Sequence, residues 1–266
     1  MRTRRIWAIA LNTFREAARI RILYGVVALV LGSDFLALVL GELSIVEQGR
    51  VAQDVGLAGI SLFGSLTAIF LGVFLLYTEV QRRTIHSIVS KPLERWEFVV
   101  GKYLGMALVL SVLVALFAAS IAIILGLYGA GLTASLGKAL VLAWMEVLVV
   151  AALAIFFSSF SSPFLSGIFA LALWALGRLT PDIRAIADKA GTLWIRTLTR
   201  LALEVVPDLH LYSISGHSLE SGDLVSVHRG DFVTWTYVGD ALGHASFWIA
   251  ALLVLACLIF SRRDFV

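Results

Sequence analysis

The stretch TEVQRRTIHSIVSKPLERWEFVVGKYLG, residues 78–105, decides how this chain folds. It gathers five basic and three acidic side chains between two long apolar runs. Charges at this density are costly inside lipid, so we expect the stretch to lie in water at a membrane surface. Ile85, Ile88, Val89 and Leu93 are interleaved with the charges, which predicts an element that packs rather than a disordered loop.

The composition of the chain indicates a protein that crosses a membrane several times. Of its 266 residues, 60% are hydrophobic and 15% are charged. In soluble domains about a quarter of all residues are charged. The single cysteine, Cys257, excludes an internal disulfide and a multi-cysteine metal site. The net charge of +3 is small, and membrane topology explains the basic residues better than nucleic-acid binding does.

Six apolar runs approach the length that crosses a bilayer, roughly 20 residues. The turn-forming sequences GAGLTASLGK and SSFSSP follow the third and fourth runs, so each should close a helical hairpin. We therefore predict an all-α membrane protein with six transmembrane helices in a single domain, residues 1–266. The predicted spans cover about residues 23–43, 57–77, 99–128, 139–160, 163–179 and 245–260.

Basic flanks predict the orientation of these spans. Arginine and lysine accumulate in residues 1–22, in residues 78–105 and at Arg262 and Arg263. An even number of spans places all three regions on one side, which the distribution of positive charge marks as cytoplasmic. Both termini are therefore expected in the cytoplasm.

The first 22 residues also carry an amphipathic pattern. At helical spacing Trp7, Phe14 and Ala17 fall on one face, and Arg5 and Arg19 fall on the other. A helix of this kind lies in the membrane interface. The alternative is a basic flank that only orients the first span.

The segment 180–243, on the outer side in this topology, should contain a helix over Arg184–Val206 and then break at Pro207. The sequence VVPDLHLYSIS, residues 205–215, turns back toward apolar character. It could re-enter the membrane surface, which is tolerable only if protein buries its backbone.

Two acids fall within predicted spans. Glu146 lies near the middle of the fourth span, where an ionised carboxylate costs at least about 2.5 kcal/mol, and Asp34 lies in the first. Each must face the bundle interior, be neutral or have a partner. A cavity-lining or proton-carrying group is one interpretation of Glu146; a structural hydrogen bond between helices or subunits is favoured for both acids.

Several common motifs are missing from the sequence. A phosphate-binding loop of the GxxxxGK[ST] type is absent, as are HExxH and GxSxG. Four of the five histidines fall in residues 180–244, but their spacing matches no compact metal-ligand set. We therefore expect no metal site in this chain and no ATP hydrolysis by it.

The charged stretch has its own local order. Glu79, Arg82 and Arg83 fall within one helical turn and can pair with one another. Residues 90–92, Ser-Lys-Pro, should break the helix, and LERWEFVVGKYL, residues 93–104, restarts it. This predicts a short helix on the membrane surface that docks a soluble partner. The alternative is a charged loop that only sets topology.

Four segments carry a family resemblance: E-x-x-R-R-T-I at 79–85, S-K-P-L-x-R-W-E-F at 90–98, G-K-Y-L-G at 101–105 and F-S-R-R-D-F at 260–265. With them the chain resembles the permease subunits of type-2 ABC exporters. It is most similar to the branch that includes the permease of the nitrous-oxide-reductase maturation transporter.

The resemblance implies a coupling region, residues 79–98, that docks in a cleft of a separate ABC ATPase subunit, which would bind ATP and Mg²⁺. It further implies a second permease copy, a bacterial or archaeal inner membrane, and an outer helical cap formed by residues 180–243. Glu79, Arg82 and Arg83 would link the second span to the docking helix. The docking residues would be Lys91, Pro92, Leu93, Glu94, Arg95, Trp96, Glu97 and Phe98.

Two other functions are alternatives to a transporter. A membrane anchor or assembly factor could dock a cytoplasmic protein without transporting anything. An intramembrane enzyme is disfavoured, because no nucleophile and base occur at matched depth in the predicted spans.

Overall fold

The computed structural model describes residues 2–19, 21–43, 48–81, 94–129, 131, 133–189, 194, 197, 199, 203–204, 206–213 and 233–262. These residues contain helices and no strand. The helices are α1 (Arg2–Ala18), α2 (Arg21–Leu43), α3 (Gln48–Gln81), α5 (Arg95–Leu127), α6 (Ala134–Ser158), α7 (Pro163–Arg178), α8 (Thr180–Lys189), the 3₁₀ turn η1 (Leu209–Tyr212) and α10 (Trp235–Arg262).

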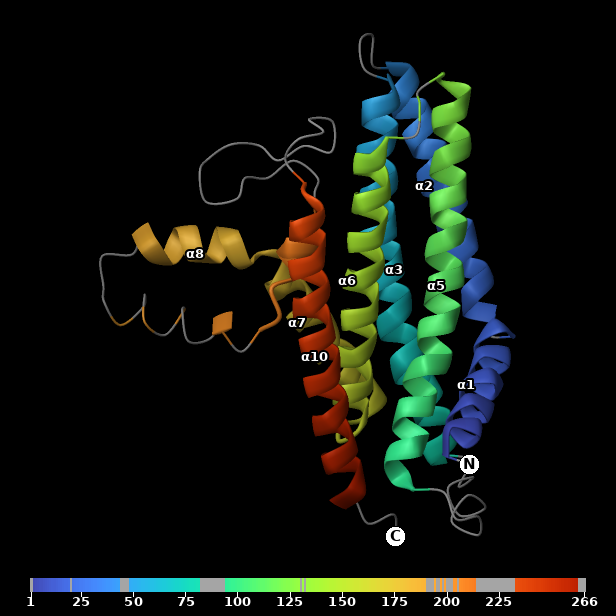
Figure 1. The fold of residues 1–266 in the computed structure, drawn as a ribbon, viewed down its shortest axis with the longest axis vertical. Coiled ribbons are helices and arrows are strands. Elements are labelled where there is room, and N and C mark those ends of the chain that lie inside the picture. Colours follow the sequence, from blue (N-terminus) through green and yellow to red (C-terminus); the bar gives the residue numbers. More distant parts are fainter. Residues whose placement is uncertain are drawn as a thin grey trace.

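Helix α6 lies at the centre of the bundle and packs against α3, α10, α5 and α7 (Figure 1). Its most apolar window is 67% buried, compared with 28% in α2 and 17% in α10. Burial of this kind separates a core helix from helices that face outward. The large apolar side chains that α2 and α10 expose are therefore available to lipid or to a second copy of the chain.

Within the described residues, five helices are long and apolar enough to span a membrane: α2, α3, α5, α6 and α10. A sixth crossing exists only if α7 and α8 form one broken span, and these two helices are bent by 64° at their junction. Helix α7 has 16 residues and is therefore about 24 Å long, less than the roughly 30 Å of a bilayer core. The prediction of an all-helical membrane protein is confirmed, with five or six spans.

The two predicted hairpins are confirmed. Helix α6 packs against both α5, which precedes it, and α7, which follows it. The first turn closes at Gly129, whose φ of 67° lies in the left-handed region that glycine adopts without steric cost. The second turn ends at Ser162, the residue before α7. Pro163 is the first residue of α7, where the missing N–H of proline removes no helical hydrogen bond.

Five helices begin earlier than the apolar runs predicted. Their starts are Arg21 for α2, Gln48 for α3, Arg95 for α5, Ala134 for α6 and Trp235 for α10. Hydropathy detects the part of a helix that lipid can solvate, whereas the hydrogen-bonded helix continues into its polar flanks. The expected long helix over 184–206 is described only in part, as the end of α8 and scattered helical residues up to 204.

Helix α1 packs along the first half of α5 (Figure 1). Two glycines of α5 allow this close approach. A Cβ atom added at Gly101 would lie 2.8 Å from the Cβ of Ile9, and one added at Gly105 would lie 2.5 Å from the carbonyl oxygen of Ala10. The spacing of these glycines is that of the small-xxx-small motif for helix association in membranes. The start of α1, the start of α5 and the end of α10 lie at one end of the bundle.

Candidate functional site

The first turn of α5 is held by its own side chains. Glu94 is the N-cap residue and forms a capping box with Glu97, which satisfies backbone N–H groups that lack helical partners. The indole N–H of Trp96 donates to the Glu94 carboxylate. Glu97 is 1% exposed and Phe98 is 7% exposed, whereas Trp96 remains 38% exposed.

Arg95 connects this turn to the end of α10. Its Nη1 donates to the carbonyl of Ser261 at 2.8 Å and to that of Phe260 at 3.3 Å. The last carbonyls of a helix have no helical partner, and the negative end of the helix dipole favours a cation there. Beneath it the rings of Phe98 and Phe260 stack with centroids 5.9 Å apart.

Lys102 ties the same region to α1. Its ammonium group lies 3.3 Å from the Glu16 carboxylate and 5.8 Å from the centre of the Phe98 ring. The Lys102 side chain is 3% exposed, so removing Glu16 would leave a buried charge without its carboxylate partner. Helices α1, α5 and α10 are thus joined at the end where the charged stretch enters α5.

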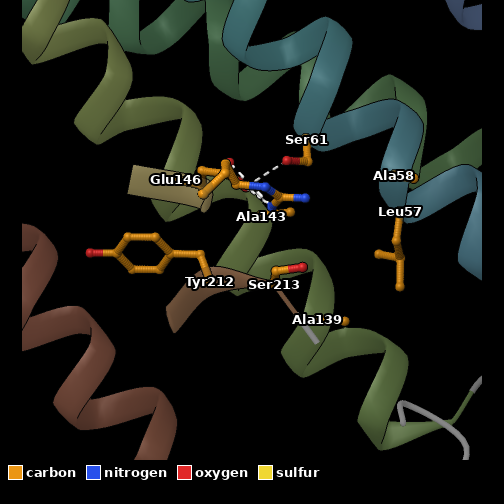
Figure 2. Close-up of a pocket in the computed structure, with 9 residues that line it drawn as sticks. Leu57, Ala58, Ser61, Ala139, Ala143, Glu146, Tyr212 and Ser213 are labelled. Atoms are coloured by element: carbon orange, nitrogen blue, oxygen red, sulfur yellow. Dashed lines mark hydrogen bonds and ion pairs between the residues drawn. The ribbon is translucent and has the colours of Figure 1, made fainter. Parts of the chain in front are cut away.

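A second polar cluster lies within the bundle around Glu146, whose carboxylate accepts from three side chains (Figure 2). Ser61 of α3 donates to Oε2 at 2.7 Å, and Trp174 of α7 donates to Oε1 at 3.2 Å. Nη1 of Arg178, at the end of α7, lies 3.3 Å from Oε2 and 3.4 Å from Oε1. Glu146 therefore links α3, α6 and α7 through side-chain hydrogen bonds.

A small pocket adjoins this cluster between α3, α6, α7 and η1. It is bordered by Glu146 and Arg178, by apolar side chains and by the η1 segment (Figure 2). The volume open to the centre of a water molecule is about 20 Å³, which accommodates one or two waters rather than a whole substrate. Its lining residues are Leu57, Ala58, Ser61, Ala139, Ala143, Glu146, Arg178, Tyr212 and Ser213.

The η1 segment is anchored to α10 by aromatic and imidazole groups. Trp248 donates to Nε2 of His244 at 3.0 Å, and an indole N–H can only donate. The proton of a neutral His244 is therefore on Nδ1, which lies 2.8 Å from the Tyr212 hydroxyl. Leu209 and Tyr212 are 0% and 2% exposed, so these two side chains of η1 are packed inside the protein.

A model of the ABC-2 family transporter proteins matches residues 7–265 of the chain. The chain belongs to this family. No curated protein matches it. An ABC-2 permease is the membrane component of an ABC transporter, and it relies on a cytoplasmic ABC ATPase as its partner.

The predicted docking residues and the predicted charge cluster of the permease fall into three groups. Arg82, Arg83 and residues 91–93 (Lys91, Pro92, Leu93) lie outside the residues that the structure describes. Glu79 lies in the last turns of α3. Glu94, Arg95 and Trp96 are exposed at the start of α5, where Glu97 and Phe98 are buried.

The two intramembrane acids of the permease lie in different places. Glu146 is in the cluster with Arg178, which sequence reasoning did not connect to it. The sequence contained a signal for this pair, because Arg178 is a basic residue near the end of the apolar run 163–179, which follows the predicted hairpin turn. Asp34 of α2 accepts from the Ser120 hydroxyl of α5, and its buried Oδ1 has no hydrogen-bond partner in the part of the chain that the structure describes.

Proposed function

We propose that this permease is the transmembrane subunit of an ATP-driven exporter. Residues 79–98 dock on a separate ATPase and pass its movement to the spans. The observation that carries this proposal is the bond from Arg95 to the end of α10. It joins the exit of the charged stretch to the last helix of the chain.

The mechanical argument follows from the joined helices. Arg95 holds the end of α10, and Lys102 holds α1 through Glu16. The glycine contacts at Gly101 and Gly105 leave α1 no room to move independently of α5. A displacement applied just before Arg95 would therefore move α1, α5 and α10 together.

The buried and exposed residues divide the proposed docking region by role. Glu97 and Phe98 hold the first turn of α5 in place, since both side chains are packed inside the protein. Glu94, Arg95 and Trp96 offer the exposed side chains of this turn. The proposed ATPase cleft would therefore contact Glu94, Trp96 and the preceding residues 91–93, with Glu79, Arg82 and Arg83 connecting them to α3.

The remaining parts of the proposal complete the transporter. ATP and Mg²⁺ bind the ATPase subunits, and two permease copies, identical or different, form the membrane part in a bacterial or archaeal inner membrane. Both termini and the coupling region face the cytoplasm, and α1 lies at the membrane interface. The exposed apolar faces of α2 and α10 contact lipid or the second copy.

Co-purification of the ATPase with the permease tests the docking assignment. The double variant Glu94→Ser/Trp96→Ala removes two exposed side chains, while serine can still cap the first turn of α5 and the side chains of Arg95, Glu97 and Phe98 stay in place. We expect at least a tenfold loss of bound ATPase. Ile123→Ala is the matched control, because Ile123 lies near the other end of α5 and is 66% exposed.

Unchanged binding by the double variant would contradict the docking assignment. The rate of ATP hydrolysis distinguishes the proposed transporter from a membrane anchor. If the wild-type permease binds the ATPase but never changes its rate of ATP hydrolysis, the proposed coupling fails and the anchor is favoured.

A further inference from the structure

We propose that the pocket beside Glu146 and Arg178 is a binding site for an anionic oxygen group, a carboxylate or a phosphate. Four residues that line it, Leu57, Ala58, Ala139 and Ala143, lie in the first halves of α3 and α6, and these helices start at the end of the bundle opposite the start of α5 (Figure 1). The proposal does not depend on coupling to an ATPase, because binding can be measured with the permease alone.

The first step is that Glu146 has no room for another donor. Its carboxylate offers about four lone-pair positions. Oε1 accepts from Trp174 and Arg178, and Oε2 accepts from Ser61 and Arg178. A ligand ammonium or hydroxyl donor would have to displace one of these groups, so the chemistry of the pocket does not favour a cationic ligand.

The second step is that Arg178 has donors to spare. A guanidinium carries five N–H groups in a planar fork, and two of its nitrogens can bind one carboxylate or phosphate side by side. Arg178 reaches Glu146 through Nη1 alone. Its Nε and Nη2 have no hydrogen-bond partner among the described residues, and its side chain is 26% exposed where it borders the pocket.

The third step concerns what happens to Glu146 when an anion binds. Ser61 and Trp174 continue to donate to Glu146 if Arg178 turns part of its fork toward a ligand. The buried carboxylate then keeps two hydrogen bonds, which limits the cost of sharing the cation. This arrangement allows Arg178 to serve both anions.

The shape of the pocket limits the ligand to a small head group. The rest of the lining is mostly apolar and comes from Leu57, Ala58, Ala139 and Ala143, together with the hydroxyl-bearing Ser213. With space for one or two waters, the pocket admits the acidic oxygens of a ligand while the rest of the ligand stays outside. An anionic lipid head group and a free phosphate share this chemistry.

Thermal unfolding of the full-length permease in phosphatidylcholine nanodiscs tests the site. One series adds phosphatidylglycerol to the nanodiscs, and the other adds inorganic phosphate to the buffer. A ligand that binds only the folded state raises the unfolding midpoint. We expect stabilisation by at least one anion; the series that responds identifies its source as lipid or solution.

Two variants make this test specific. Arg178→Gln removes the donor, and Ala58→Leu fills the pocket from an exposed position on α3 while the ion pair remains. Both should weaken the anion response at least tenfold in apparent affinity. Arg184→Gln is the control, because Arg184 is 56% exposed and pairs with Asp208 outside the pocket.

The Ala58→Leu variant keeps the proposal falsifiable if Arg178→Gln fails to fold. An anion response equal to wild type in Ala58→Leu would overturn the site. The absence of any response to both anions in the wild-type protein would also overturn it.

Discussion

The guanidinium of Arg95 donates to the backbone carbonyl of Ser261 at 2.8 Å, across 166 positions of the sequence. This bond closes the chain on itself at the end of the bundle where the charged stretch enters α5. The first turn of α5 and the last turn of α10 are therefore one structural unit, supported by the stacked rings of Phe98 and Phe260.

Replacing Arg95 should loosen the end of α10. Arg95→Ala removes the donor to two terminal carbonyls, each hydrogen bond being worth about 1 kcal/mol. We expect amide hydrogen exchange to accelerate roughly fivefold or more over the last turns of α10, with the centre of α6 unchanged. Equal exchange in the variant and the wild type would show that the bond does not hold this helix end.

The contact between α1 and α5 predicts opposite effects for two glycine substitutions in the same helix. A Cβ at Gly105 would lie 2.5 Å from both the Ala10 carbonyl oxygen and the Thr13 Cβ. Gly105→Ala should therefore cost about 1–3 kcal/mol by overpacking. Equilibrium unfolding in mixed micelles measures this loss.

Gly126→Ala is the control for that experiment. Nothing lies within 4 Å of a Cβ at Gly126, and alanine is about 1 kcal/mol more favourable than glycine within a helix. This variant should be neutral or more stable than wild type. If both alanine variants behaved alike, the close packing of α1 on α5 would be contradicted.

The Glu146–Arg178 pair should show strong thermodynamic coupling. Glu146→Gln leaves the partly buried Arg178 without its carboxylate partner, and we expect a loss of about 1–3 kcal/mol. The double variant Glu146→Gln/Arg178→Gln removes both charges and should recover part of that loss. Unfolding free energies of the two single variants and the double variant give the coupling energy. Strict additivity would mean that the two side chains do not interact.

The hydrogen bond between His244 and Tyr212 should hold η1 against α10. Tyr212→Phe deletes the hydroxyl that lies 2.8 Å from Nδ1 of His244. We expect a loss of about 1 kcal/mol, with faster amide exchange confined to residues 206–213. Tyr24→Phe is the matched control, since Tyr24 is 71% exposed on α2. Unchanged exchange in Tyr212→Phe would show that packing alone holds the segment.

Much of the fold follows from sequence because it depends on local chemistry. Long apolar runs need helices to satisfy their backbone, and turn sequences such as GAGLTASLGK end them. The requirement that Glu146 have a partner also follows, from the cost of a buried charge. Whether α7 crosses the membrane did not follow, because its apolar run resembles a full span while the structure bends it against α8.

The features that sequence reasoning missed depend on contacts between distant residues. The partnership of Glu146 with Arg178 needs the α6–α7 hairpin to bring the end of α7 beside the middle of α6. The role of Gly101 and Gly105 needs α1 to pack on α5. Likewise, Arg95 belongs to a charged stretch that indicates a surface, and only the folded chain shows that it binds the end of α10.

The most direct test of the account is ATP hydrolysis by the reconstituted complex of the permease and its ATPase, comparing wild type with Arg95→Ala. The account predicts that the variant still binds the ATPase, because Glu94 and Trp96 are intact, but loses most of the stimulation of ATP turnover by the permease. Full stimulation with Arg95→Ala would contradict the claim that α5 and α10 transmit the movement together.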